Sequence, residues 1–567
     1  MPQKTGIGRD QMMLFCTEQQ ISSENRVRVI DAFVDALDLK GLGFVIKGKT
    51  KEGSPAYSAS MLLKLYCYGY LNRIRSSRRL EAECQRNIEL WWLLEQQKPC
   101  YHTISDFRKT NAKALQKTFH QFVVMCREWE LYGKETIAID GAKFRAQNSK
   151  KNNYNQKKID QHLAYIDQKV EDYLEALDQY DQCETAQDQV SSKAQAVISL
   201  EDSSSDFHPN SDNSPAEQKL HTSLQTKSIQ RHKYQTLQTQ LTAAFEQDGT
   251  RQISTTDPDA RALPLRMGIV EVSYNVQTAV DSKNKLIAHY EVLNERDDYA
   301  LADMGIGAKE HLQVKNLNAL ADKGYHTGSE LKRSRRSGIR TYVSTPKNPS
   351  SLKKGKYAKE YFIYNKSTDS YTCPAGKVLT TNGQWYKRKS RGIKRKSYQV
   401  KVYKTEFATC RDCPNAQACA GPSNLHRSKG REIQRTEYDY YIETNKARVE
   451  KNQDLYRSRQ AIVEHPPSSR GRLFGTIKRG WGYTHTLLKG KEKVKGEFGL
   501  ILTMYNLRRA MSLLGISELI NRLKALFFDF CTFFRPLKPR DRSQPQIFCS
   551  YSEALCSVLL GNSLFLK

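Results

Sequence analysis

Apolar residues recur at three- and four-residue steps through the first part of the chain. The segments MLLKLYCYGYLNRI, RSSRRLEAEC and ELWWLLEQ all carry this spacing. It places the apolar side chains on one face of a helix, so the pattern predicts an all-helical domain over residues 1–131. Ser76 suits a helix start, and Thr103 with Asp106 resembles a capping box before a longer helix.

The hydrophobic period changes from helical to alternating at Thr136. TIAIDGAKF, VEVSYNVQTAV, LIAHYEVL, NLNALAD and IRTYVST are β-branched or alternating, and the helix-like GSELKRSRR lies among them. Strands that precede and follow helices predict an α/β catalytic domain. In the sequence this domain is split into residues 132–150, 266–345 and 436–515.

Two insertions interrupt the α/β pattern. Residues 151–265 contain apolar positions spaced as in a coiled coil, and residues 183–223 between the two helical stretches have the composition of a disordered connector. This insertion is either a solvated helical arm or a dimerisation arm. Residues 346–435 form a basic, irregular, Cys-containing insertion, and the tail 516–567 has no assignment from its pattern.

Charge indicates the class of partner. Lys and Arg number 90 against 61 Asp and Glu, which gives a net charge of +29. Such an excess favours a polyanionic partner over a neutral metabolite. There is no long apolar run and no signal peptide pattern, so we expect a soluble cytoplasmic protein, and the 13 scattered cysteines suggest reduced thiols.

Three carboxylates are candidates for one metal site. Asp140 is expected at the end of the first strand, Asp322 at the end of NALAD, and Glu464 at the end of a helix. Oxygen ligands suit Mg²⁺ or Mn²⁺, and two such ions can promote phosphodiester chemistry. Each acid alone has another explanation than metal binding, because strand ends and helix ends often carry solvated carboxylates or carboxylates in salt bridges to arginines. We interpret Asp281, Asp297 and Asp298 as loop carboxylates outside the site.

Four cysteines have the spacing of a zinc site. The pattern C-x36-C-x2-C-x5-C is formed by Cys373, Cys410, Cys413 and Cys419. Thiolates in such pairs bind structural Zn²⁺, and the alternative is four reduced thiols packed in a small β-rich unit.

A basic run with interleaved aromatic residues lies in the same insertion. Between residues 375 and 404 there are ten Lys or Arg and no Asp or Glu. This favours sequence-tolerant contact with double-stranded DNA over a merely solvated surface. The candidate DNA-binding residues are Lys387, Arg388, Lys389, Arg391, Lys394, Arg395 and Lys396. The arginines near the predicted helix start (Arg73, Arg75, Arg78, Arg79) are either a second DNA contact or a solvated helix face.

Several motifs together resemble a known family. IAIDGAKFRAQNSK, TDPDAR before EVSYNVQTAVD, LADKGYHTGSEL, YTCPAGKVL with CRDCPNAQAC, and VEHP with FGTIKRGWGY occur in this order. They resemble the DDE-class transposases of bacterial insertion sequences with a Tyr-Arg-Glu-Lys signature. The resemblance implies a ribonuclease-H-like, retroviral-integrase-like catalytic fold, a homo-oligomer in the DNA complex and association with the nucleoid.

The resemblance also assigns roles to residues. It places the catalytic triad at Asp140, Asp322 and Glu464, and the signature residues that position terminal phosphates at Tyr456, Arg459 and Lys478. It implies a reaction in which Mg²⁺ or Mn²⁺ assists cleavage at the element ends and their joining to target DNA. The alternatives are a decayed DNA-binding remnant and a nuclease that cuts without joining.

The chain departs from the family pattern after Pro466. PSSRGRL, residues 467–473, separates VEHP from FGTIK, so that Lys478 follows Glu464 by 14 residues. Either the insert loops out and the following segment docks normally, or Glu464 is displaced and the copy is impaired.

Overall fold

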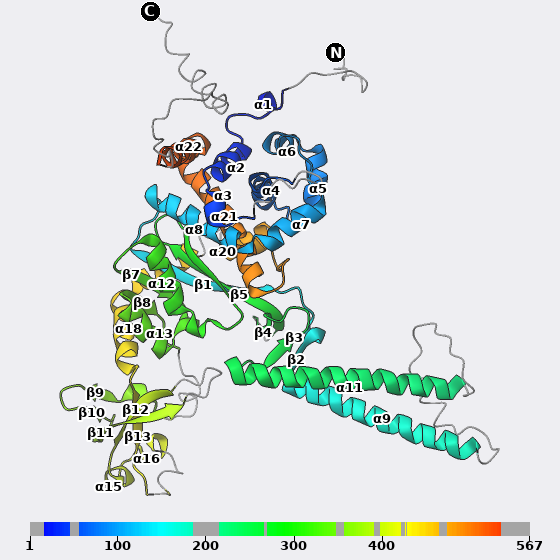
Figure 1. Cartoon of the computed structure of the whole chain (residues 1–567). Coiled ribbons are helices and arrows are strands. Elements are labelled where there is room, and N and C mark those ends of the chain that lie inside the picture. The colour runs from blue at the N-terminus through cyan, green and yellow to red at the C-terminus, as the bar shows by residue number, and fades with distance from the viewer. Residues whose placement is uncertain are drawn as a thin grey trace, which may run out of the picture.

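The computed structural model describes residues 16–45, 56–184, 215–265, 269–346, 357–389, 397–420, 426, 428–463 and 473–533. Figure 1 shows a helical unit next to a mixed sheet, a long two-helix arm that projects from the sheet, and a small β unit at the other end.

The N-terminal unit is helical, as the apolar spacing predicts. Phe33, Phe119 and Phe122 are fully buried in its core. The Ser76 hydroxyl accepts a hydrogen bond from the Arg79 amide and caps a helix, as expected. The helices are α1 (Thr17–Gln20), α2 (Arg26–Asp35), α3 (Leu39–Leu42), α4 (Ala59–Leu71), α5 (Ser77–Arg86), α6 (Ile88–Leu93), α7 (Tyr101–Thr110) and α8 (Ala112–Glu128).

The predicted capping box is wrong. Thr103 and Asp106 both lie inside α7, which follows Cys100, and the longer helix α8 begins only at Ala112. The Thr103 hydroxyl is 3.3 Å from the Cys100 sulfur and does not cap a helix.

The mixed sheet contains the strands that the alternating pattern predicts. They are β1 (Thr136–Arg145), β5 (Val270–Asp281), β6 (Ile287–Leu293), β7 (Leu317–Ala321) and β8 (Ile339–Val343), with β4 (Arg261–Pro264) in addition. The order is β4-β5-β1-β7-β8, and β6 also pairs with β5. β5 is antiparallel to β1, β4 and β6, whereas β1, β7 and β8 run parallel.

Helices pack on both faces of the sheet. Along β6, Tyr290 contacts Phe119 of α8 and donates to the Lys495 carbonyl, while His289 faces Gly307. Adjacent residues of a strand point to opposite faces, so α8 and α21 lie on one face and α12 on the other. The helices around the sheet are α12 (Leu301–Leu312), α13 (Gly328–Arg336), α18 (Asp439–Lys451), α19 (Gln453–Val463), α20 (Leu473–Gly475) and α21 (Lys491–Leu514).

The TDPDAR motif anchors the start of α21. Asp257 accepts a hydrogen bond from the Gly490 amide at 3.0 Å, and Asp259 accepts one from the Lys491 amide at 2.7 Å. Carboxylates satisfy the free amides at a helix N-terminus and interact favourably with its dipole. The motif therefore fixes α21, whose side chains fill the core beneath the sheet.

The helical insertion forms the arm in Figure 1, in which α9 (Gln156–Glu184) and α11 (Pro215–Asp248) lie side by side. Tyr154, Ile159, Leu237 and Leu241 form a small core at its root, next to β2 (Asn153–Asn155) and β3 (Gln252–Ser254). Because α11 begins at Pro215, the last part of the predicted connector is helical.

The Cys-containing insertion is an ordered antiparallel sheet, so its description as irregular is wrong. The strands follow the order β13-β12-β11-β10-β9, and Tyr371, Leu379 and Tyr403 are buried between them. Their bounds are β9 (Ile363–Asn365), β10 (Ser370–Thr372), β11 (Val378–Lys389), β12 (Ser397–Lys404) and β13 (Glu432–Thr436), and the short helices α15 (Phe407–Arg411) and α16 (Ala416–Cys419) follow β12.

The unassigned tail begins with a helix. α22 (Ile516–Phe533) packs against α2, and its Leu519 and Leu523 are fully buried. Within the described ranges no helix has the length and apolar character needed to cross a membrane.

Candidate active site

Asp140 lies within β1, not at its end as predicted. β1 continues to Arg145 and stays paired with β5 over that length, where Asp140 is opposite Thr278. The parallel pairing with β7, in contrast, ends at Ala138 and Leu320. At Asp140, β1 is therefore paired with β5 on one side and no longer paired with β7 on the other.

Asp322 lies beside Asp140 because of the strand register. Ala138 pairs with Leu320, and each aspartate is two residues beyond its member of that pair. Asp322 begins the 3₁₀ turn η4 (Lys323–Tyr325) and accepts a hydrogen bond from the Gly324 amide at 2.7 Å. The two carboxylates thus come from adjacent parallel strands at the same edge, although 182 residues separate them in the sequence.

The surroundings of Asp140 disfavour its negative charge. Burial raises the pKa of its carboxyl to about 6, and the charges of Asp322 and Asp297 act in the same direction. The Gly141 amide and the Arg459 guanidinium partly oppose this rise in pKa. A carboxylate held in this way gains from a nearby cation, which is the environment expected of a metal ligand or an acid–base group.

A third carboxylate, which the sequence analysis excluded, lies at the same place. Asp297 begins the 3₁₀ turn η3 (Asp297–Tyr299), and its Oδ1 accepts hydrogen bonds from Asn275 Nδ2 at 2.8 Å and Gln277 Nε2 at 2.7 Å. A Cβ atom on Gly141 would lie only 2.9 Å from the Asp297 Oδ1, so Asp297 is directly beside the residue that follows Asp140.

A signal for Asp297 was present in the sequence. Asn275 and Gln277 are polar residues on one face of the apolar strand VSYNVQTAV, and both are fully buried. Buried amides need hydrogen-bond partners, so their presence indicated a polar group facing β5. Tyr325 adds to this network by donating its hydroxyl to the Gln277 Oε1.

The predicted signature residues come from α19 and from the segment after the insert. Arg459 is close enough to Asp140 to influence its pKa, and Tyr456 packs against the main core. Lys478, in the π-helical turn η6 (Thr476–Gly480), donates to the Lys143 carbonyl at 2.6 Å and lies 4.4 Å from the Phe144 ring centroid. Glu464 follows Val463, the last residue of α19, and lies outside the described residues.

The last residue of the insert and the segment after it are docked on the sheet. Residues 467–472 are outside the described residues, but Leu473, Phe474 and Ile477 are buried in the main core. The Phe474 ring packs edge-on to Phe144 of β1 with centroids 6.0 Å apart. This arrangement agrees with the alternative in which the segment FGTIK docks normally on β1.

The four candidate zinc ligands surround one small cavity. Cys373, Cys410, Cys413 and Cys419 all line it, and β11, α15 and α16 contribute its other walls. The Lys377 amide donates to the Cys373 sulfur at 3.3 Å, and the Arg431 amide to the Cys410 sulfur at 3.5 Å. Burial raises the pKa of the Cys419 thiol, and the other three cysteines add to this rise.

The candidate DNA-binding residues divide into two groups. Lys387, Arg388 and Lys389 are exposed at the end of β11, and Trp385 and Tyr386 beside them are 44% and 41% exposed. The other four (Arg391, Lys394, Arg395, Lys396) lie outside the described residues. The exposed aromatic rings next to cations suit contact with a nucleic acid backbone.

One arginine of the N-terminal group does not belong on a binding surface. Arg75 is only 9% exposed, and its guanidinium contacts the Glu497 carboxylate at 3.3 Å and donates to the His485 carbonyl at 2.8 Å. It also lies 4.4 Å from the centroid of the Tyr483 ring. Arg75 therefore joins the helical unit to α21 and is unavailable to DNA.

Comparison with known protein families identifies two regions of the chain. Residues 15–110 match the family described as a transposase domain (DUF772), and residues 372–511 match a transposase DDE domain. The resemblance to the DDE-class transposases of insertion sequences is confirmed. No curated protein and no solved structure matches the chain.

These matches indicate the general chemistry. They support a DNA-processing enzyme of the transposase class, for which DNA is the partner, and DDE transposases generally use divalent metal ions. The second match begins at residue 372, so it spans the four cysteines, α19 and the docked segment that carries Lys478. The two-helix arm lies between the two matched regions.

Proposed function

We propose that this transposase cleaves the ends of its own insertion sequence and joins them to target DNA by metal-dependent phosphodiester transfer. The observation that carries the proposal is the register that brings Asp140 and Asp322 to one edge of adjacent parallel strands. The mixed sheet with helices on both faces is the framework that we assign to the ribonuclease-H-like fold.

The carboxylates of the site suit Mg²⁺ or Mn²⁺. Asp140, Asp322 and Glu464 offer oxygen ligands, which hard divalent cations prefer. When bound, such ions lower the pKa of an attacking water or 3′-hydroxyl and stabilise the leaving oxygen. The raised pKa of Asp140 supports this assignment, because a cation would offset the unfavourable charge.

The remaining residues of the signature position the DNA. Arg459 lies on the same helix as Tyr456, shortly before Glu464, and Lys478 is held on β1 beside Phe144. A guanidinium beside Asp140 and an ammonium further along β1 are suited to hold phosphate oxygens as the scissile bond reaches the site. We assign Tyr456, Arg459 and Lys478 this positioning role.

The test is an in vitro reaction of the full chain with Mg²⁺ and DNA that carries the native element ends. Asp140→Asn, Asp322→Asn and Glu464→Gln are each expected to reduce strand cleavage to background while DNA affinity stays within about twofold. Asp160→Asn, on the exposed surface of α9, is the matched control and should cleave normally. Parallel loss of DNA binding and cleavage would point instead to a structural role for these acids.

The same reaction separates the alternative functions. Joined products in the presence of target DNA support a transposase, whereas cleaved ends without joined products indicate a nuclease. A protein that binds the ends but neither cuts nor joins them is a remnant. Deletion of residues 467–473 restores VEHP-FGTIK, and a gain of cleavage in the deletion protein would show that the insert impairs this copy.

DNA contact and assembly are part of the proposal. We assign electrostatic contact with the DNA backbone to Lys387, Arg388 and Lys389, and we assign synapsis of two element ends to a homo-oligomer.

We further propose that the four cysteines around the small cavity hold one structural Zn²⁺. The backbone amides that donate to the sulfurs of Cys373 and Cys410 support this proposal.

A further inference from the structure

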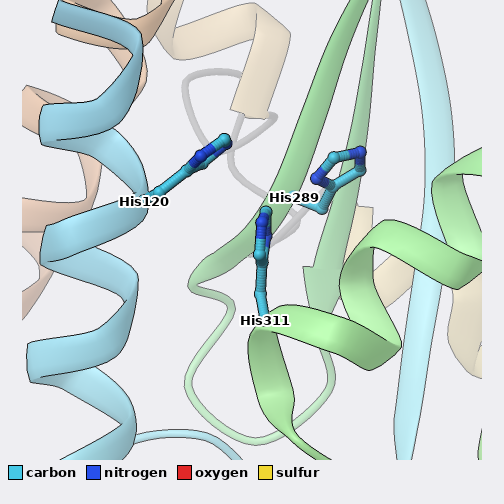
Figure 2. Close-up of side chains that lie close together, drawn as sticks. All are labelled: His120, His289 and His311. Carbon is cyan, nitrogen blue, oxygen red and sulfur yellow. The ribbon is translucent and has the colours of Figure 1, made fainter. Parts of the chain in front are cut away.

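Three histidines from distant parts of the chain come together at the edge of the mixed sheet. His120 lies in α8, His289 in β6 and His311 near the end of α12, and Figure 2 shows their rings turned toward one another. One ring nitrogen of each lies within 4.8 Å of those of the other two. The ring centroids are 4.4, 4.9 and 6.4 Å apart.

The position of β6 explains why these rings meet. Within the described ranges β6 hydrogen-bonds to β5 alone, so its other side is an edge of the sheet. α8 and α12 pack on opposite faces and contact each other beyond this edge. The three histidines therefore lie where the helical unit, the edge strand and α12 join, and all are half-buried.

Two of the ring nitrogens are buried without a hydrogen-bond partner among the described residues. His311 Nδ1 lies 3.0 Å from the Ala288 carbonyl, so it donates there and leaves Nε2 with a free lone pair. His120 Nε2 and His289 Nδ1 are buried and have no hydrogen-bond partner among the described residues. Buried polar atoms without partners are rare in folded proteins, and an ion that these nitrogens ligate would account for them.

Burial favours the neutral form of the rings, which is the form that binds a metal. Burial, together with the nearby His311 and Lys495, lowers the pKa of His120 to about 4. Burial also places the pKa of His289 well below its ordinary value. The charged groups around the cluster include both signs. The Lys495 ammonium is paired with the Glu291 carboxylate at 2.8 Å, and the Glu310 carboxylate lies near His311.

We propose that His120, His289 and His311 bind one transition-metal ion of the zinc class. Neutral imidazoles are ligands that Zn²⁺ accepts readily, whereas Mg²⁺ prefers oxygen, so this site is distinct in chemistry from the carboxylate site. Tetrahedral zinc needs ring nitrogens about 3.3 Å apart, which small rotations of the rings can provide. Three protein ligands leave the fourth position to water. The ion fastens α8 to the sheet edge, and this role does not depend on the proposed reaction.

The test uses the full chain with Cys410→Ser and Cys413→Ser, which removes competition from the thiol cluster. Co²⁺ is added to the metal-free protein, because Co²⁺ with imidazoles shows weak visible bands and lacks the intense ultraviolet charge-transfer band of thiolate ligands. We expect one Co²⁺ per chain with the imidazole spectrum, displaced by Zn²⁺ and unaffected by excess Mg²⁺.

Variants of the cluster decide the assignment. His311→Gln should weaken Zn²⁺ binding at least about tenfold, since even changes to the outer partners of a ligand cost that much. His120→Gln should do the same and provides a second variant if His311→Gln does not fold. His232→Gln, on the exposed surface of α11, is the matched control and should bind as the parent does. Absence of Co²⁺ and Zn²⁺ binding in the Cys variant, or unchanged affinity in both His variants, would overturn the proposal.

Discussion

Asp140 reduces the stability of the folded protein at neutral pH. Its pKa is about 6 when folded and 3.8 when unperturbed, so the folded state binds its proton more tightly between these values. The free energy of unfolding therefore falls as the pH rises through this window. Because the residue is half-buried, we expect Asp140→Asn to stabilise the metal-free protein at pH 7 by about 2 kcal/mol, and far less at pH 4. Urea unfolding of both proteins at the two pH values measures this difference.

Two further measurements test whether the charge of Asp140 causes this pH dependence of stability. Asp297→Asn removes a negative charge beside it and should lower its pKa, which narrows the pH window in which stability changes. Mg²⁺ should raise the melting temperature of the parent protein but not that of Asp140→Asn. A stability difference of the same size at both pH values would contradict the proposed cause.

At the scale of single elements, the start of α21 depends on two aspartates with different surroundings. Asp259→Ala removes one cap and should cost about 1 kcal/mol of unfolding free energy. Asp257→Ala should cost about 2 to 3 kcal/mol, because Asp257 is fully buried and also accepts from the Tyr274 hydroxyl at 2.7 Å. Chemical unfolding measures both.

The control for the α21 caps is an exposed ion pair. Asp303 pairs with Arg333 and is 66% exposed, so Asp303→Ala should cost less than about 1 kcal/mol. If Asp257→Ala cost no more than Asp303→Ala, the anchoring role of TDPDAR would be wrong.

Alternation and apolar spacing predicted the helices of the N-terminal unit and the main strands of the mixed sheet, but not where each element ends. β1, β5, β6, β7 and β8 follow directly from alternating β-branched residues. The extent of β1 beyond Asp140 was not predictable, because it is set by pairing with β5, which is distant in the sequence. The Cys-containing insertion was described as irregular, with a small β-rich unit only as an alternative, because several of its strands are short or rich in Lys, Arg and Thr.

The site was also predictable only in part, because some of its residues are brought together by segments that are distant in the sequence. Family resemblance pointed to Asp140 and Asp322, which the strand register brings side by side, although Asp140 is not at a strand end. Asp297, in contrast, lies in a turn whose sequence resembles any polar loop. Its role becomes visible only through Asn275 and Gln277, which β5 presents to it. Likewise Arg75 has the sequence context of a basic surface, and only the tertiary packing of α21 buries it.

At the scale of the whole molecule, the pair of Arg75 and Glu497 couples the helical unit to the core. Glu497 is fully buried and also accepts from the Leu487 amide at 2.9 Å. Removing one member leaves a buried charge, so Arg75→Ala should cost about 3 kcal/mol or more. In a double-mutant cycle with Glu497→Ala the two costs should be non-additive by more than about 1 kcal/mol. Additive costs in urea unfolding would show that the two side chains are not coupled.

The net charge of +29 predicts a strong dependence of DNA affinity on salt. Log K should fall with log salt by about 0.9 for each phosphate neutralised. Replacing Lys387, Arg388 and Lys389 with Ala should reduce this slope by about 0.9 for each phosphate that these side chains neutralise, and should weaken binding to all sequences equally. Fluorescence anisotropy at several salt concentrations measures the slope.

A control for the slope of log K against log salt removes three positive charges from another part of the chain. Lys219, Arg231 and Lys233 lie on α11, and their replacement with Ala should leave the slope closer to that of the parent protein. Affinity that did not change between low and physiological salt would exclude an electrostatic interface altogether.

The length of the two-helix arm determines how far its end would move when its root rotates. α11 has 34 residues, which corresponds to about 51 Å of helix, and its small core of Tyr154, Ile159, Leu237 and Leu241 lies at one end. A rotation of about 10° at that end would therefore move the far end by about 9 Å. A small rotation at the root would thus be magnified into a displacement of nearly three base-pair steps at the far end.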